Sequence, residues 1–171
     1  MEAILYLYVD KSVPGLYDTY QNHVEEHNNK IENSKYPDSG FDLLVPENQT
    51  IQHNQNTSYF LDYKVKTEMT FKMFENSPEL PSAFQIYLRS SVSKTPLMLS
   101  NHVGVIDSGY RGNIKGAFRC LNVDQYYVQK YQKLVQICHP LLCKIRVVLV
   151  DNEQDLSSTE RGEGGFGSTG K

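Results

Sequence analysis

The sequence predicts a mainly β fold, in which many short strands form a sandwich, a jelly roll or a barrel. Two observations support this prediction. From Tyr59 to Met73, apolar residues alternate with polar ones at the period of two that is typical of a half-buried strand. Elsewhere, short β-rich runs recur between turn-forming residues, and only one segment has the spacing of a helix.

The N-terminal part of the chain is predicted to contain a strand, a helix and a second strand. Residues 3–9 are all apolar, which favours a strand. Between Gly15 and Asn33, apolar residues recur at helical spacing among polar ones, which predicts one amphipathic helix. Residues 41–45 form another short β-rich run, and the polar stretch at residues 48–58 predicts a loop.

The rest of the chain is predicted to consist of strands joined by turns. The alternating residues 59–73 are one strand, or two strands broken near Thr67. Residues 83–89 alternate in the same way, and residues 103–106 and 145–150 are shorter β-rich runs. Residues 154–165 have the composition of a linker that leads into a glycine-rich end.

Length, charge and cysteine content limit the class of protein. The 171 residues suffice for one domain with a modest core, and a net charge of −3 gives no reason to expect binding to nucleic acid. Three cysteines are too few for a disulfide framework and fit a reducing compartment. Neither a membrane span nor a signal peptide is evident. We therefore expect a soluble, intracellular protein of the cytoplasm or nucleus that does not bind membranes.

The glycines are concentrated in two short segments. Four of the eleven lie between Gly104 and Gly116, and five lie in the last eleven residues. The first segment, GVIDSGYRGNIKG, predicts a hairpin whose tight turn carries an Asp, a Tyr and an Arg. The second, RGEGGFGSTGK, is a loose arm that carries an Arg and a Phe. A purely structural hairpin and a tail without a role are the alternative interpretations.

These two segments and three others resemble, in order along the chain, the signature motifs of the trimeric deoxyuridine triphosphatase (dUTPase) family. The five stretches are SGFDL (39–43), RSSV (89–92), GVIDSGYRGNIKG (104–116), KLVQI (133–137) and RGEGGFGSTG (161–170). The resemblance implies a distorted jelly-roll barrel with one or two short helices, assembled as a homotrimer. It also implies a barrel domain at residues 1–156, with insertions at 15–33 and 48–58, and a flexible arm at 157–171 that closes a neighbouring active site.

The reaction that this resemblance implies is the hydrolysis of dUTP to dUMP and pyrophosphate, which clears dUTP from the nucleotide pool and supplies dUMP. Asp107 matches the family's general base, which activates the water that attacks the α-phosphorus. Tyr110 matches the residue that packs under the deoxyribose and leaves no room for a 2′-hydroxyl. Asn101 is expected to fix the base or an ordered water. The uracil edge would pair with the backbone around Gly104, Val105, Ile106 and Lys115.

The other motifs are implied to bind the triphosphate and Mg²⁺. The implied phosphate ligands are Arg89, Ser90, Ser91 and Gln136, although Gln136 also fits a buried structural role. Asp42 matches the residue that holds the hydration shell of Mg²⁺ through water. In the arm, Arg161 would clamp the γ-phosphate and Phe166 would stack on the uracil. Gly167, Ser168 and Thr169 would present amides and hydroxyls to the terminal phosphate.

The sequence departs from the family pattern at several positions and leaves two other functions open. Ser91 replaces a Gly, Lys133 an Arg, and Val135 a small residue beside Gln136. The two insertions, rich in Asn and Lys, leave a virus-encoded origin open. A dCTP deaminase shares the fold, but no carboxylate stands near Ala117, where its proton shuttle is expected. A non-catalytic or regulatory dUTP-binding protein is the other alternative.

Overall fold

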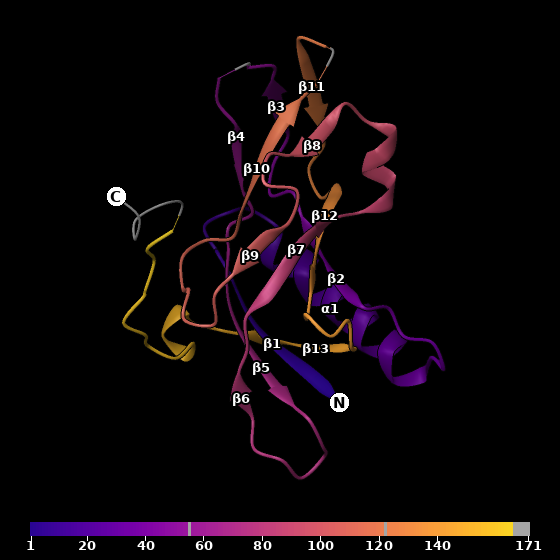
Figure 1. The fold of residues 1–171 in the computed structure, drawn as a ribbon, viewed down its shortest axis with the longest axis vertical. Helices are drawn as coiled ribbons and strands as arrows, with labels where there is room; N and C mark the ends of the chain where they lie inside the picture. The colour runs from indigo at the N-terminus through magenta and orange to yellow at the C-terminus, as the bar shows by residue number, and fades with distance from the viewer. Residues whose placement is uncertain (55, 122, 166–171) are drawn as a thin grey trace.

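The computed structural model describes residues 1–54, 56–121 and 123–165, and it has the mainly β architecture that the sequence predicts (Figure 1). Within these residues, thirteen strands form four sheets, accompanied by one α-helix and two short 3₁₀ helices. In the same part of the chain, no helix is both long and apolar enough to cross a membrane.

The first sheet has the strand order β13-β1-β5-β6. Strand β1 (Glu2–Val9) runs parallel to β13 (Ile145–Val150) on one side and antiparallel to β5 (Val65–Lys72) on the other, and β6 (Leu80–Pro81) pairs with β5. Ala3, Leu5, Leu7 and Val9 on β1 are fully buried. Because these residues alternate along the strand, one face of this sheet lies against the core.

The second sheet carries most of the sequence motifs. Its order is β2 (Gly40–Leu44), β12 (Lys133–Cys138), β7 (Phe84–Leu88) and β9 (Gly104–Ile106), and all neighbours are antiparallel. The 3₁₀ helix η1 (Ser90–Lys94) follows β7 directly. Strand β7 therefore stands between the strand that carries the fourth motif and the strand that carries the third.

Two smaller sheets complete the β structure. Strand β10 (Lys115–Cys120) pairs with β4 (Tyr59–Asp62) on one side and β8 (Leu97–Leu99) on the other, and β11 (Gln125–Val128) pairs with β3 (Gln49–Gln52). The second 3₁₀ helix, η2 (Glu153–Asp155), follows β13 and precedes the glycine-rich end.

The predicted helix is confirmed as α1 (Leu16–Asn33), which packs beside β13. Its residues Leu16, Tyr20, Val24 and Ile31 are buried, as the helical spacing requires. On the same face, His27 Nε2 lies 2.8 Å from the Ile145 carbonyl, and burial lowers the pKa of this imidazole. The Asn28 side chain donates to the Val147 carbonyl at 2.8 Å and accepts from the Val147 N–H at 3.0 Å.

Two boundaries differ from the prediction. The polar stretch 48–58 is not all loop, because Gln49–Gln52 forms β3, which buries Ile51 and gains its pairing from the distant β11. The break in the alternating segment falls at residues 63–64 rather than near Thr67. There, Lys64 has a φ of 58° and its N–H binds the Asp62 carboxylate at 2.8 Å, which turns the chain from one sheet into another.

The predicted hairpin at 104–116 is a tight turn, but its flanking strands do not pair with each other. Tyr110 N–H donates to the Asp107 carbonyl at 3.0 Å, so the chain reverses at this point. However, β9 pairs with β7, whereas β10 pairs with β4 and β8. Residues 104–116, which we call the Asp107 loop, therefore join two different sheets.

The core contains two buried tyrosines whose hydroxyls differ. The Tyr20 hydroxyl accepts a hydrogen bond from the Leu44 N–H at 2.9 Å, and burial raises its pKa. The Tyr63 hydroxyl is also fully buried, but it has no hydrogen-bond partner among the described residues. The first hydroxyl satisfies a backbone donor, whereas the second incurs a desolvation cost without a compensating bond.

This pair predicts opposite effects of the same substitution. Tyr20→Phe should lower the free energy of unfolding by about 1–3 kcal/mol, because the buried Leu44 N–H loses its acceptor. Tyr63→Phe, the matched control, should leave stability unchanged or raise it. Urea unfolding of both variants measures the difference, and equal losses would contradict this account of the core.

Candidate active site

The Asp107 loop forms one wall of a cavity of about 170 Å³. The other wall comes from β7, β8 and β10, through Ile86, Leu99 and Ala117, and from the arm, through Arg161 and Gly165. Eight residues that the sequence singled out line this cavity together: Asn101, Gly104, Val105, Ile106, Asp107, Tyr110, Lys115 and Arg161. The cavity is thus narrow and largely apolar, with one carboxylate and two cationic side chains at its edge.

Tyr110 is fixed in its position in this cavity by its own loop. Its hydroxyl donates to the Asn113 carbonyl at 2.9 Å, and the Asn113 side chain in turn donates to Asp62 at 3.0 Å. Burial, together with the nearby Glu163 and Asp62 carboxylates, raises the pKa of Tyr110. The ring lies directly against Gly112, where a Cβ would stand 2.5 Å from the Tyr110 hydroxyl.

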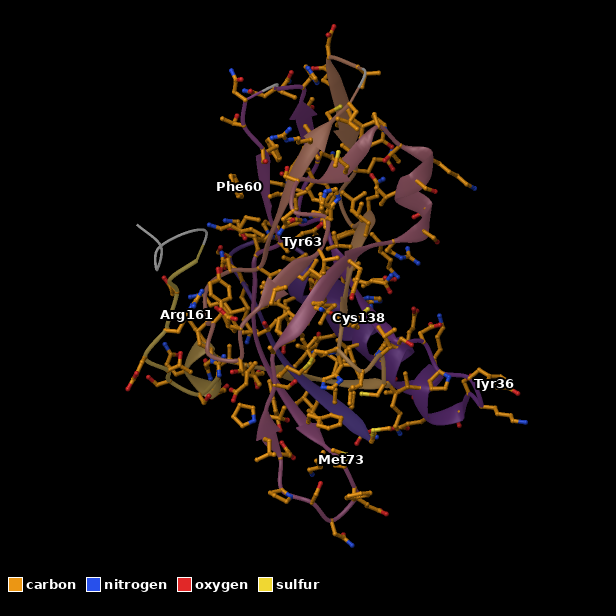
Figure 2. The ribbon with its side chains drawn as sticks, in the orientation of Figure 1. Tyr36, Phe60, Tyr63, Met73, Cys138 and Arg161 are labelled. Carbon is orange, nitrogen blue, oxygen red and sulfur yellow. The ribbon has the colours of Figure 1, made fainter. Side chains whose placement is uncertain are left out.

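Asp107 stands at the mouth of the cavity, with its side chain 55% exposed. Arg161 Nη1 lies 3.0 Å from Asp107 Oδ2 in the same chain, and Figure 2 shows Arg161 at the edge of the molecule opposite to Tyr36. The carboxylate is therefore accessible to water on one side and neutralised on the other.

A second cluster of predicted residues lies on β2, β12 and the end of β7, and we call Asp42, Arg89, Lys133 and Gln136 the Asp42 cluster. Arg89 Nε lies 2.9 Å from Asp42 Oδ1, and Lys133 Nζ lies 3.8 Å from Asp42 Oδ2. Gln136 is the register partner of Asp42, and its side chain lies across Gly40, where a Cβ would stand 2.3 Å from Gln136 Oε1. Ser90 and Ser91 open η1 directly after Arg89 and are exposed. This arrangement offers two cations and several donors to an anion.

The Asp42 cluster does not lie beside the cavity of its own chain. Ile106 is opposite Phe84 in the register of β9 with β7, and Arg89 follows five residues later along β7. At a rise of about 3.3 Å per residue, the Cα atoms of Asp107 and Arg89 are separated by about 17 Å or more. None of Asp42, Arg89 and Gln136 is among the residues that line the cavity. The predicted site residues therefore form two separate groups.

The first part of the arm, residues 157–165, lies against the Asp107 loop, and we call it the arm root. Thr159 Oγ1 donates to the Gly109 carbonyl, and Arg111 N–H donates to the Gly162 carbonyl at 2.7 Å. Glu163 forms an ion pair with Lys66, which also binds Glu153 at 2.6 Å. The segment that the sequence predicted as a linker is thus attached over much of its length. Phe166, Gly167, Ser168 and Thr169 lie outside the described residues.

Several residues of this region were missed by the sequence analysis. Arg111 stands inside a quoted motif but received no role, and Glu68 is one of the polar residues that alternate along β5. Ser157 and Asn113 carry no signal of their own in a single sequence. Each of them acts through a partner that is distant along the chain, so the pairing becomes visible only in three dimensions.

The residues around Asp42 fit a magnesium ion whose direct ligands are phosphates and water rather than protein side chains. Asp42 is the single carboxylate of its cluster, and both of its oxygens face cations. Among the described residues, no group of three or more His, Cys, Asp or Glu side chains could hold a metal ion. This donor set suits Mg²⁺ held by phosphates and water, with one carboxylate beyond the hydration shell.

The chain is similar to proteins that are named deoxyuridine 5′-triphosphate nucleotidohydrolase. One from Alkaliphilus metalliredigens is 33% identical over 134 residues, which cover 78% of this chain and 83% of that protein. Another, from Clostridium kluyveri, is 42% identical over 74 residues, which cover 43% of this chain but only 50% of that protein. A solved dUTPase from Streptococcus mutans matches 70% of this chain and 86% of its own, with 20% identity and a TM-score of 0.48. The model of the dUTPase family matches residues 27–170.

The close contact between Gly112 and Tyr110 predicts a site-specific effect of adding a methyl group. Gly112→Ala should lower the free energy of unfolding by about 1–3 kcal/mol, because the new Cβ would overlap the Tyr110 hydroxyl and displace the ring. Gly109→Ala in the same turn is the control, since its Cβ would meet its nearest neighbour, the Arg161 Cβ, at an ordinary 3.5 Å. Denaturant unfolding of both variants tests this, and equal effects would show that Tyr110 is not held against Gly112.

Proposed function

The chain belongs to the dUTPase family and is a dUTP diphosphatase, and from that premise we propose how its residues bind and cleave dUTP. The observation that carries the proposal is the cavity in which Asp107, Tyr110 and Asn101 meet beside the backbone of residues 104–106. An enzyme that hydrolyses a nucleotide needs a pocket for the nucleoside and a general base near the phosphorus that is attacked.

We assign the nucleoside to this cavity. The N–H and C=O groups of Gly104, Val105 and Ile106, with Lys115 nearby, would bind the edge of uracil. Tyr110 would pack under the deoxyribose, where its ring is fixed by the bond to Asn113 and by the contact with Gly112. A rigid ring leaves no space for a 2′-hydroxyl, so the pocket would reject ribonucleotides. Asn101 would fix the position of the base or of a water molecule.

We assign the chemistry to Asp107 and the triphosphate to the Asp42 cluster. Asp107 would take the proton from the water that attacks the α-phosphorus, since it is partly exposed at the mouth of the cavity. Arg89, Ser90, Ser91 and Gln136 would bind phosphate oxygens. The dUTPase family typically uses Mg²⁺, which neutralises the triphosphate, and Asp42 would bind this ion through water.

We further propose a homotrimer in which each active site is shared between subunits. The support is the separation of about 17 Å or more between Asp107 and Arg89 along β7, which is too long for both to reach one α-phosphate. A neighbouring subunit must then supply the Asp42 cluster to the cavity. In a cyclic trimer, the threefold axis would repeat this contact between each subunit and the next, so that all three sites are completed.

The arm would complete the site of a neighbouring subunit. Arg161 pairs with Asp107 on one side and leaves the other side of this carboxylate accessible, where the attacking water would bind. When substrate enters, Arg161 would exchange this ion pair for the γ-phosphate, which carries more negative charge. Phe166 would then cover the uracil, and Gly167, Ser168 and Thr169 would bind the terminal phosphate as a lid. Because dUTP is an intracellular nucleotide, we place the protein inside the cell.

Selectivity tests the nucleoside pocket. Hydrolysis of dUTP should exceed that of UTP and dTTP by roughly a hundredfold or more in kcat/KM, because a packed ring excludes the 2′-hydroxyl and a close backbone excludes the 5-methyl group. Tyr110→Ala should raise the rate with UTP relative to dUTP. Pyrophosphate release from dUTP, dCTP, dTTP and UTP measures these ratios. Comparable use of UTP by the unmodified protein would refute the role of Tyr110, and no release from dUTP would refute the function.

Mixed trimers test the sharing of sites. Asp107→Asn should lower kcat roughly a thousandfold, the scale for loss of a general base, and Arg161→Ala should also impair the reaction. When the two variants are unfolded and refolded together, about one quarter of sites (one half times one half) should contain both an intact Asp107 and an intact Arg161 from different subunits. Activity should return toward that fraction. If verified mixed trimers stay inactive, Arg161 serves the Asp107 of its own chain.

A further inference from the structure

The side chain of Arg111 joins the Asp107 loop to the arm root. This side chain is only 12% exposed. Arg111 Nη1 donates to the carbonyls of Ser108 at 2.9 Å and Tyr110 at 3.0 Å, which flank the turn after Asp107. On its other side, Nε donates to the Ser157 carbonyl at 2.8 Å and Nη2 to the Ser157 hydroxyl at 2.9 Å. One planar group therefore fixes the turn and the arm root relative to each other.

Glu68 completes this arrangement from the body of the protein. Its carboxylate accepts hydrogen bonds from the Ser157 N–H and from the Ser157 hydroxyl, both at 2.8 Å, and it lies 3.5 Å from Arg111. Glu68 is on β5, which is paired on both sides by β1 and β6. The backbone N–H, the backbone carbonyl and the hydroxyl of Ser157 are therefore all bound, although the residue itself is exposed.

These contacts exceed what a passive connection to the arm requires. A loose tail needs no ordered attachment, and each charge-assisted hydrogen bond is stronger than a neutral one. Here a cation and an anion, both largely shielded from water, converge on one serine of the chain. The attachment stands four residues before Arg161, so it fixes the beginning of the arm root.

We propose that Glu68, Arg111 and Ser157 are positioning residues for dUTP hydrolysis. They fix the arm root to the Asp107 loop, and this attachment sets the position from which the arm closes. The inference rests on the proposed function of the arm. Fixing the root reduces the conformational freedom that the arm loses when it closes over substrate. None of the three residues needs to touch the nucleotide.

The first test uses the free protein and does not depend on substrate. Ser157→Ala should increase the rate of tryptic cleavage after Arg161 by roughly tenfold, because removal of the hydroxyl loosens the root. Ser158→Ala, at the next exposed position, is the matched control, and Ser157→Thr should recover most of the protection because it keeps the hydroxyl. Mass spectrometry of the released C-terminal peptide measures the rate. Equal cleavage of Ser157→Ala and Ser158→Ala would overturn the proposal.

The second test measures whether the root acts through the arm. Ser157→Ala should weaken binding of a non-hydrolysable α,β-imido analogue of dUTP by roughly tenfold in calorimetry, with Ser158→Ala again as control. In an Arg161→Ala background, the same substitution should have little further effect, as a double-mutant cycle requires for residues that act together. An equal loss in both backgrounds would place the effect in the loop alone and overturn the proposal. Absence of binding to the unmodified protein would instead refute the proposed function.

Discussion

The position of strand β7 between β12 and β9 is the constraint on which the site depends. Because this strand pairs on both edges, the Asp107 loop attaches near one end and Arg89 stands at the other. The length of this short strand then separates Asp107 from Arg89. In the function that we propose, both residues serve one substrate, so a neighbouring subunit would supply one of them.

Both carboxylates that we assign to the reaction are paired with a cation. Asp42 faces Arg89 and Lys133, and Asp107 faces Arg161. These pairs hold the carboxylate side chains in fixed positions. A triphosphate carries more negative charge than either carboxylate, so it competes for the same cations when it binds. In the function that we propose, these ion pairs hold the cations that would bind the phosphates.

Much of the fold and the site could be predicted from the sequence, because periodicity and motifs are local. Strand β7 and helix α1 follow from spacing, strands β1 and β13 follow from apolar or β-rich runs, and the residues of one motif line one cavity. The predictions that failed concern the pairing of strands that are distant along the chain or belong to different sheets. Strand β3 is polar and depends on β11 for its hydrogen bonds, and β9 and β10 flank a tight turn yet join different sheets. Contacts such as Ser157 with Glu68 leave no periodic signal for the same reason.

The bond between Asn28 and Val147 has a consequence for the behaviour of the protein in concentrated solution. Strand β13 is at the edge of its sheet, where unpaired N–H and C=O groups are a template for strands of other chains. Asn28 satisfies both groups of Val147, and His27 binds the carbonyl of Ile145. The helix thereby occupies the positions that an added strand would use. Because these β13 groups are already bound by α1, they are not available to a strand of another chain.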